Sequence, residues 1–528
     1  MSIQHYYIGV GGTGARVAEA LVHLCAAGLG PEELFLMLID PDAGNGNLSR
    51  TTELISRYQE IQAQIGTRAD GVSLFRTRIV TPTPLVWTIF KQQNQTLSSF
   101  IALNSLEASA KPLKHLAEML FTEGDLDERL NEGFRGRPAI GAVVMAQPSA
   151  ELPPWSQFWE QIALVSREDE AKVFVVGSIF GGTGAAGIPT LGAAAVIRDR
   201  AALESDTAAN SNGGRKKSKV YLGSCLVLPY FSFTQDVPAD ERGRNFVRPD
   251  DFPLATSAAL HYYLTKQLAY DEMYLIGDSS NEVVGSFGAG AGAQKNRAHY
   301  VELGAALSAL DFFTYGKPTT SRETQYFFSA RNGETVDWGA LPSSRRADAV
   351  VNVQTSVKYR LVSATMFFYA ASAYGSKTLK AMDGAGVTPP TWFTDHFAKK
   401  ARLEPRMNPR SPDQEAMIGR LDSFGESFLH WLRDIGGDRS VALTNMRALL
   451  DDSGALLAWR SAPVGQLNGD GSSKLQFETF VGSCLNEPSL LKANAGAVAA
   501  DRYFNLFSLA ADRFTQKYLN VQNSQAER

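Results

Sequence analysis

Two glycine-rich segments of identical composition, Gly11–Gly14 and Gly181–Gly184, carry the residue types best suited to bind a phosphate group. Each reads Gly-Gly-Thr-Gly, so the candidate binding residues are Gly11, Gly12, Thr13, Gly14, Gly181, Gly182, Thr183 and Gly184. Glycine allows a tight turn and a close approach of the backbone to a bound group. Where such a turn opens a helix, its free N–H groups and the positive end of the helix dipole favour an anion. We therefore expect the backbone amides of both segments to hold phosphates, with the Thr183 hydroxyl donating to a phosphate oxygen.

The elements predicted around the first segment alternate between strand and helix. A short strand is predicted over His5–Val10, and apolar residues at helical spacing predict a helix over Ala15–Ala27. A second strand over Leu34–Ile39 ends at Asp40 and Asp42. Nucleotide-binding β-α-β units have this order of elements: a strand, a glycine turn, a helix, a second strand and an acidic residue. The alternative is that the glycines serve only the close packing of a helix on a strand.

The second glycine-rich segment has the same setting as the first. An apolar run that begins at Val173 predicts a central parallel strand covered on both faces. The alanine- and leucine-rich run Ile188–Ile197 predicts a helix after the turn. One such loop is a short motif of low specificity, so the argument for a shared site rests on the pair.

Composition describes an ordinary globular protein. At 528 residues the chain is long enough for two or three domains, and its 44% hydrophobic content is typical of a soluble protein. A net charge of −4 gives no signal for nucleic acid or an anionic membrane. Cys25, Cys225 and Cys484 form no CxxC pair, so neither a disulfide framework nor a zinc site is expected. No apolar run has transmembrane length, and a strand begins almost at once, so a cytoplasmic protein without a signal peptide is expected.

The sequence pattern changes past residue 320. We predict an α/β core over residues 1–313, with a mainly parallel sheet, helices on both faces and a central helix over Asn296–Phe313. Residues 314–363 read as a mixed connection, with β-like runs at Thr324–Ser329 and Ala349–Ser363. Residues 364–528 read as a mainly helical C-terminal domain.

The order of motifs over about residues 5–313 resembles that of the tubulin/FtsZ superfamily. The matching segments, in chain order, are Gly9–Gly14 (first phosphate loop), Ile39–Ala43 (acidic segment near the phosphates), Gly136–Gly141 (loop that meets the terminal phosphate), Phe180–Gly187 (glycine-rich signature loop), Pro229–Phe233 (near the ribose), Met273–Asp278 (strand that ends at the guanine-reading residue) and Asn296–Phe313 (central helix). The resemblance is to a divergent, bacterial-type tubulin-like protein. It implies GTP as the ligand and self-association through the nucleotide face.

The resemblance also suggests roles for side chains beyond the glycine loops. These roles are Mg²⁺ binding through water for Asp42 beside Asp40, a γ-phosphate contact for Arg137 or Arg135, guanine recognition for Asp278, and base hydrogen bonding and stacking for Asn296 and Tyr300. Mg²⁺ sites usually combine one or two carboxylates with phosphates and waters, and arginine suits phosphate by bidentate contact. The alternatives are a solvated turn for Asp42, surface positions for the arginines and a core position for Tyr300.

The chain departs from the family pattern at several positions. The signature loop has Phe180 in place of its first glycine and Ala185 in place of Ser/Thr, and its last glycine is displaced to Gly187. The guanine-reading Asn is Asp278, whose carboxylate can accept from the N1–H and amino groups of guanine. The acidic Asn-x-Asp-x-x-Asp/Glu motif that should follow the central helix is missing after Thr314–Pro318. GTP hydrolysis is therefore expected to be slow or partner-dependent, and no catalytic residue is assigned.

Other readings remain open at this stage. Asp40 and Asp42, followed by Asn47 and Arg50, also resemble the ATP site of adenylate-forming, ubiquitin-activating-like enzymes. This chain has none of the CxxC pairs that are usual in those enzymes, and the interpretation leaves the loop at Gly181 unexplained. A plain NAD-binding domain also leaves that loop unexplained. A nucleotide-dependent switch or scaffold that does not hydrolyse its ligand is a third possibility, and a protein partner for the C-terminal domain is a further expectation.

Overall fold

The computed structural model describes residues 4–65, 68–88, 95–130, 133–134, 136–146, 151–165, 170–192, 219–234, 249–266, 268, 270–278, 282–286, 296–316, 324–329, 335–336, 338, 341, 353–384, 386–397, 408–436, 441, 443, 480–493 and 498–518. Structural statements below concern these residues. Among them, no helix is both long enough and apolar enough to cross a bilayer.

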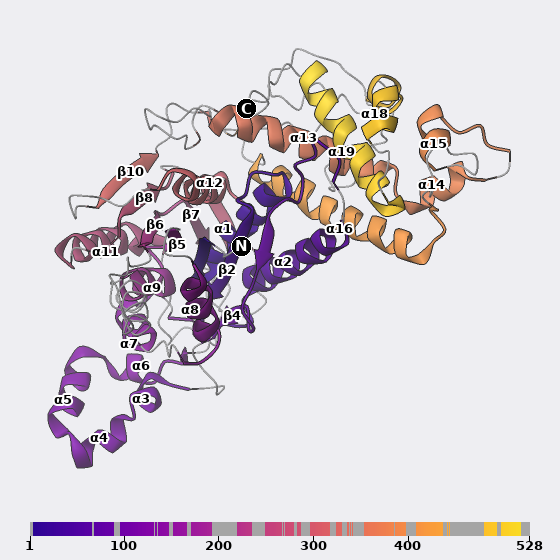
Figure 1. Ribbon diagram of the computed structural model, residues 1–528. Coiled ribbons are helices and arrows are strands. Elements are labelled where there is room, and N and C mark those ends of the chain that lie inside the picture. The colour runs from indigo at the N-terminus through magenta and orange to yellow at the C-terminus, as the bar shows by residue number, and fades with distance from the viewer. Residues whose placement is uncertain are drawn as a thin grey trace, which may run out of the picture.

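A parallel sheet forms the centre of the molecule (Figure 1). Its strand order is β10-β8-β6-β5-β1-β2-β3, with β4 paired to β2, and every pairing between its strands is parallel. The strands are β1 (His5–Val10), β2 (Glu33–Ile39), β3 (Arg78–Val80), β4 (Val86–Trp87), β5 (Glu170–Ser178), β6 (Lys219–Val227), β8 (Glu272–Ile276) and β10 (Gln325–Ser329). A second, two-stranded sheet pairs β7 (Phe231–Thr234) with β9 (Glu282–Ser286). The predicted α/β core with a parallel sheet is confirmed.

The order of strands reverses between β1 and β5. From β1 the chain moves outward through β2 and β3, and from β5 it moves outward in the other direction through β6, β8 and β10. Val10 and Gly177, near the carboxyl ends of β1 and β5, are register partners. Open parallel sheets bind ligands outside the carboxyl ends of their strands at such a reversal. Both glycine-rich segments follow these two strands.

Helices cover both faces of the sheet because side chains alternate between the faces along each strand. Tyr7 of β1 belongs to one apolar core, and Tyr6 and Ile8 belong to the other. The first core includes side chains of α1 (Gly11–Ala26), α2 (Gly46–Gln64), α12 (Tyr300–Tyr315), α13 (Val353–Ala373), α16 (Pro412–Ile435) and α19 (Ala499–Tyr518). The second core includes side chains of α7 (Pro138–Met145), α8 (Trp155–Leu164), α9 (Gly182–Gly192) and α11 (Phe252–Lys266).

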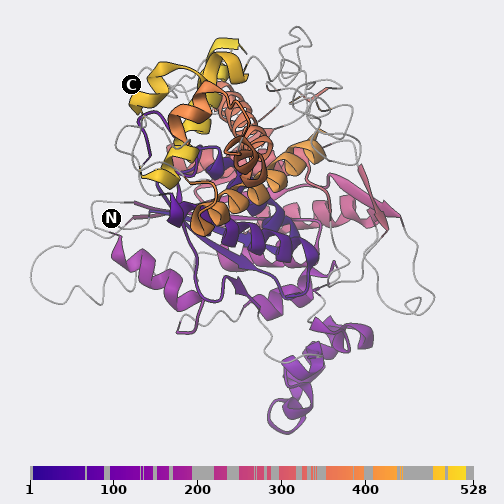
Figure 2. The same cartoon turned by 90° about the vertical axis from the view of Figure 1, so that its right-hand side faces the viewer.

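The C-terminal helices pack on the core that α1 and α2 also line (Figure 2). His23 of α1, for example, stacks on Trp431 of α16 with ring centroids 4.7 Å apart. The mainly helical character predicted for this region is confirmed, and α14 (Ser376–Met382), α15 (Thr391–His396) and α18 (Pro488–Ala493) add to it. The domain boundary predicted at residue 364 stays a prediction; it falls within helix α13.

One predicted element is wrong. The β-like run Ala349–Ser363 is helical from Val353 onward, and residues 349–352 lie outside the described part of the chain. Val357, Leu361 and Ala364 are buried at helical spacing in the core described above. Packing of this apolar face therefore overrides the β-propensity of the run, which is itself a context-dependent preference. The other run, near Thr324–Ser329, does form a strand, β10.

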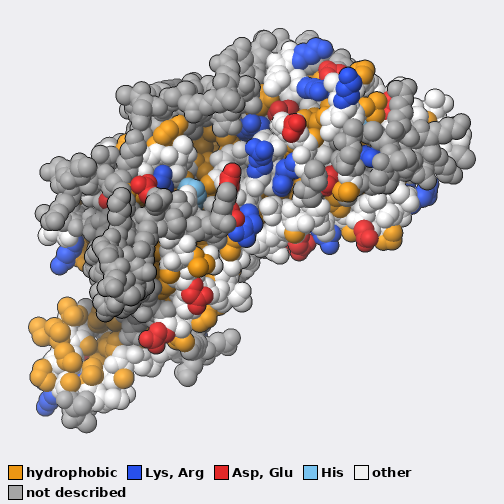
Figure 3. All heavy atoms as spheres, viewed as in Figure 1, with side chains coloured by type: hydrophobic (Ala, Val, Ile, Leu, Met, Phe, Trp, Pro, Cys, Tyr) orange, Lys and Arg blue, Asp and Glu red, His pale blue; other side chains and the backbone are white. Residues whose placement is uncertain are grey.

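Four short helices extend away from the body of the molecule: α3 (Leu97–Phe100), α4 (Leu103–Ser109), α5 (Lys111–Leu120) and α6 (Glu123–Leu126) (Figure 1). Helix α5 has no buried residue and exposes Leu113, Leu116, Met119 and Leu120. Figure 3 shows apolar side chains gathered on this arm.

Candidate functional site

Both glycine-rich segments open helices at the carboxyl edge of the sheet. Helix α1 begins at Gly11 and helix α9 begins at Gly182, earlier than the predicted starts near Ala15 and Ile188. Val10, the residue before α1, gives no side-chain hydrogen bond to the first turn. The first N–H groups of a helix have no partner within the helix. The backbone therefore presents donors where strands β1 and β5 end.

The two segments contact each other. A Cβ atom built on Gly11 would lie 3.2 Å from Thr183 Cβ and 3.7 Å from the Gly184 nitrogen. The φ of Gly11 is +71°, a conformation that side-chain-bearing residues rarely adopt, so this position requires glycine for the turn itself. The structure thus brings together two segments whose first residues, Gly11 and Gly181, are 170 positions apart in the sequence.

The glycines divide into two groups by what surrounds them. A Cβ on Gly14 would lie 2.6 Å from the Gly9 carbonyl carbon, and one on Gly184 would clash with the Ser178 carbonyl oxygen. These two glycines allow close packing of a helix on a strand, as the alternative reading predicts. A Cβ on Gly12 meets only the amides of Asn45 and Asn47, the nearest at 3.2 Å, and one on Gly181 meets only Ser178 Oγ at 3.1 Å. Gly12 and Gly181 therefore face side-chain atoms, which can move aside for a ligand.

A third loop, Gly136–Arg137, lies against the second glycine-rich segment. A Cβ on Gly182 would lie 3.1 Å from the backbone nitrogens of Gly136 and Arg137. The Arg137 side chain forms an ion pair with Asp125, so a phosphate contact from its guanidinium would require that pair to open. Arg135, the alternative to Arg137, lies outside the described residues.

Asp40 and Asp42 are buried just beyond the carboxyl end of β2. The Asp42 N–H donates to Asp40 Oδ1 over 3.0 Å, and the Gly44 N–H donates to Asp42 Oδ1 over 2.9 Å. Burial raises the pKa of Asp40 to about 7; the Asp42 N–H opposes this rise and the Asp42 charge adds to it. Asp40 is therefore partly protonated at neutral pH, which limits the negative charge beside the phosphate-binding loops.

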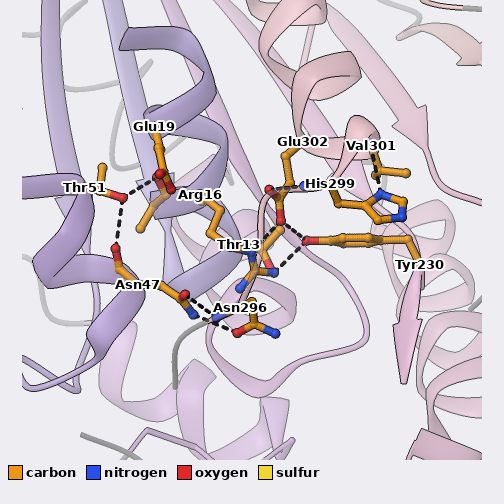
Figure 4. Close-up of polar contacts among 12 residues, drawn as sticks. Thr13, Arg16, Glu19, Asn47, Thr51, Tyr230, Asn296, His299, Val301 and Glu302 are labelled. Atoms are coloured by element: carbon orange, nitrogen blue, oxygen red, sulfur yellow. Dashed lines mark hydrogen bonds and ion pairs between the residues drawn. The ribbon is translucent and has the colours of Figure 1, made fainter. Parts of the chain in front are cut away.

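Asn296 is fixed in place by helix α2. Asn47 Nδ2 donates to Asn296 Oδ1, and the Asn296 N–H donates to Asn47 Oδ1, both over 2.9 Å (Figure 4). Arg50 Nη1 donates to the Asn296 carbonyl oxygen over 2.9 Å. The Nε and Nη2 groups of Arg50 donate to the Glu19 carboxylate over 2.7–3.0 Å. Asn296 is thus held three residues before His299, the N-cap of α12.

Tyr300 and Asp278 occupy different environments. Tyr300 is the first residue of α12 and is 8% exposed, with its ring 4.6 Å from that of His299. Its burial agrees with the core position kept as an alternative. Asp278 lies two residues beyond β8, at the same edge of the sheet as the glycine-rich segments.

A buried polar network that sequence reasoning missed joins the first glycine-rich segment to α12. Arg16 Nε donates to Glu302 Oε1 over 2.5 Å, and Arg16 Nη2 donates to the Tyr230 hydroxyl over 2.6 Å (Figure 4). Tyr230 in turn donates to Glu302 Oε1 over 2.6 Å. Arg16 Nη2 also reaches Thr13 Oγ1 at 3.3 Å. The signal available in the sequence is that Arg16 and Glu19 are charged residues within a mainly apolar helix, α1.

Glu302 also caps the start of helix α12. Its Oε2 accepts from the His299 N–H over 3.0 Å, while His299 Nδ1 accepts from the Val301 N–H over 3.2 Å, which closes a capping box at the start of α12. The side chains of Arg16 and Glu302 are only 4% and 2% exposed. The carboxylate and the hydroxyl of Tyr230 keep the pKa of Arg16 above its usual value despite burial.

Comparison with known proteins gives similarity in structure alone. No protein-family model and no curated protein matches the sequence. The chain is similar to CetZ2 from Haloferax volcanii, in a GTPγS-bound protofilament, with 14% identity and a TM-score of 0.25 over 59% of each chain. It is also similar to CetZ from Methanosaeta thermophila strain DSM 6194, with 12% identity and a TM-score of 0.21 over 60% of this chain and 52% of that one.

Both solved structures belong to the tubulin/FtsZ family, the family that the motif order resembles. The match spans between half and three fifths of the length of those chains. At these TM-scores the functional argument rests on this chain's own loops and sheet.

Proposed function

We propose that this chain binds GTP and Mg²⁺ at the strand reversal between β1 and β5, and that it self-associates through this face. One observation carries the proposal: two helix N-termini built from the same Gly-Gly-Thr-Gly sequence touch there, through Gly11 and Thr183. A single glycine turn occurs in many folds, whereas two adjoining helix N-termini suit a chain of phosphates.

The phosphates would be held mainly by backbone N–H groups of Gly11–Gly14 and Gly181–Gly184. The nearest neighbours of Gly12 and Gly181 are side-chain atoms, which can move aside as a phosphate approaches. The Thr183 hydroxyl would add a donor. Asp42 would hold Mg²⁺ through water: a single carboxylate fits an ion whose other ligands are phosphate oxygens and waters.

The base would be read by Asp278, Asn296 and Tyr300. The Oδ1 atom of Asn296 already accepts from Asn47, which leaves its Nδ2 group to donate to an acceptor on the base. The Asp278 carboxylate would accept from the N1–H and 2-amino groups, which guanine has and adenine lacks. Tyr300, which is buried, would contact the base with its ring edge.

Hydrolysis of the bound GTP would be slow or depend on a partner, and no residue is assigned to the chemical step. Residues 317–323, which follow α12, lie outside the described part of the chain. A nucleotide-dependent switch or scaffold uses the same binding geometry without turnover. A cytoplasmic location and a protein partner for the C-terminal region stay predictions from the sequence.

The adenylate-forming alternative fits the geometry less well. It would place phosphate contacts on Asn47 and Arg50, yet Asn47 pairs with Asn296 and Arg50 makes three contacts with the Glu19 carboxylate. It also gives no role to the second glycine-rich segment, which lies against the first.

A competition titration tests the ligand. We expect fluorescently labelled GTP to bind and to be displaced by GTP but not by ATP or NAD. In Asp278→Ala, the affinity for GTP should fall about tenfold and that for ITP, which lacks the 2-amino group, should fall less, because one charge-assisted hydrogen bond is lost only with GTP. Displacement by ATP as efficiently as by GTP would refute the proposed specificity.

Sedimentation tests self-association. Analytical ultracentrifugation with GTP, with GDP and without nucleotide should show larger species in GTP, because a nucleotide at the interface contributes contacts that the empty face lacks. Turnover is followed in the same samples by phosphate release. Three identical sedimentation profiles would contradict nucleotide-driven assembly, whatever the binding titration shows.

A further inference from the structure

A cavity of about 770 Å³ lies at the amino edge of the sheet, opposite the glycine-rich segments. It is bounded by the starts of β1 and β2, by Gly28–Pro31 just after α1, and by the last turn of α12. Arg360 of α13 and Arg76 complete its lining. Small-molecule sites commonly have volumes of about 300–1,000 Å³. The cavity is therefore large enough for a small organic ligand, and it is separate from the nucleotide site proposed above.

Arg360 is the chemically distinctive group in this cavity. The residue is 7% exposed, and a guanidinium carries five N–H donors. Among the described residues, its hydrogen bonding amounts to one contact from Nη1 to Ser73 Oγ, and Nε has no partner. Its counter-charge, Asp512, lies 3.8 Å from Nη1, beyond hydrogen-bond distance. A buried charge is normally paired and fully hydrogen-bonded, so this guanidinium has unused capacity to bind an anion.

The other walls of the cavity favour an anion with an apolar body. Burial, with a smaller effect from the Lys172 charge, lowers the pKa of His5 to about 4, so its ring is neutral at pH 7 and packs edge-on against Phe313. Leu310 of α12 adds a further apolar surface. Of the two glutamates in the lining, Glu33 is already paired with Arg78 at 2.5 Å, and Glu32 is exposed. Exposed Arg76 adds a second guanidinium.

We propose that this cavity binds a small organic anion, whose carboxylate or phosphate group contacts the guanidinium groups of Arg360 and Arg76 and whose apolar body packs on Leu310 and Phe313. Arginine binds either anion through two parallel hydrogen bonds. The proposal is independent of the nucleotide site, because no residue that lines the cavity belongs to either glycine-rich segment.

Four small compounds that share a fluorinated aromatic ring and differ in charge test the proposal. We would titrate the full chain with 4-fluorophenyl phosphate, 4-fluorobenzoate, 4-fluorobenzyl alcohol and 4-fluorobenzylamine, and follow ¹⁹F line widths. We expect the phosphate, the carboxylate or both to bind, and the neutral and cationic compounds to bind at least about tenfold more weakly, because they cannot accept charge-assisted hydrogen bonds. Comparison of the first two compounds decides which anionic group the site prefers.

Variants locate the binding. Arg76→Met and Arg360→Met should each weaken anion binding about tenfold. Thr314→Trp should weaken it at least as much, because the indole would occupy part of the cavity, which Thr314 lines from an exposed position. The matched control is Arg57→Met, which removes a half-buried arginine of α2 that does not line the cavity and should leave binding unchanged.

Two results would overturn the proposal. One is equal binding of the neutral, cationic and anionic compounds, which would indicate apolar adsorption alone. The other is anion binding that survives Thr314→Trp and Arg76→Met, which would place the anion elsewhere, for instance at the glycine-rich segments. Because both side chains are exposed, these variants are expected to fold even if Arg360→Met does not, and circular dichroism checks this.

Discussion

Gly181→Asp is expected to weaken GTP binding about a hundredfold while the protein stays folded. The new carboxylate would lie among the backbone donors that we assign to the phosphates, and two like charges about 4 Å apart repel by up to about 4 kcal/mol at the effective dielectric of a partly buried site. The added Cβ would lie 3.1 Å from Ser178 Oγ, the one atom within 4 Å of it, so a small shift of that hydroxyl group accommodates the new side chain. Gly182 is a poorer choice, because its Cβ would lie 2.8 Å from Phe134 Cβ.

The matched control for this substitution is Gly419→Asp. Gly419 lies on α16, is exposed and has no atom within 4 Å of a built Cβ. It therefore adds the same charge at another glycine, far from the site; Gly419 lies within a helix, whereas Gly181 directly precedes one. Titration of labelled GTP against both variants and the unmodified chain gives the comparison. Equal affinity in Gly181→Asp and Gly419→Asp would remove the second glycine-rich segment from the binding site.

The sequence predicts the elements around the glycine-rich segments because each signal there is local. An apolar run, a glycine turn and a helical pattern follow one another within about 25 residues, so β1, β2, β5 and the turns after them can be found without knowledge of the tertiary fold. The convergence of Gly11 on Thr183 then follows from topology, since both turns lie at the carboxyl edge of one parallel sheet.

The partners of individual polar side chains could not be predicted in this way. Asn47 and Asn296 are 249 positions apart, and nothing local to either residue indicates that their amides pair. Arg137 lies in a loop whose position suits a phosphate contact, yet its side chain pairs with Asp125 of a different short helix. The helical state of α13 likewise depends on the surface against which Val357 and Leu361 pack.

The network of Arg16, Tyr230 and Glu302 shows why such partners matter for the proposed function. Arg16 belongs to the helix that the first glycine-rich segment opens, and it contacts the Thr13 hydroxyl. Glu302 caps the helix that follows Asn296. A single buried ion pair thus connects the proposed phosphate loop with the element that presents the proposed base contact, and its loss should affect both stability and ligand affinity.

Glu302→Ala is accordingly expected to destabilise the fold by about 3–5 kcal/mol, the cost of leaving one charge of a buried pair without its partner. The substitution also removes the cap from the His299 N–H. The measurement is the urea midpoint of the tryptophan fluorescence transition. The control is Glu53→Ala, which breaks the exposed pair with Arg57, where the Glu53 side chain is 63% exposed, and should cost less than about 1 kcal/mol.

A double variant separates the charge from the packing. Arg16→Met combined with Glu302→Met removes both charges and fills similar volume, so it should be more stable than Glu302→Ala, because no uncompensated guanidinium remains in the core. It should still bind GTP less well than the unmodified chain, because Thr13 loses its contact with Arg16. If Glu302→Ala shifts the urea midpoint no more than Glu53→Ala does, the buried pair does not hold α1 against α12, and the coupling between phosphate loop and base contact must run through Asn47 and Asn296 instead.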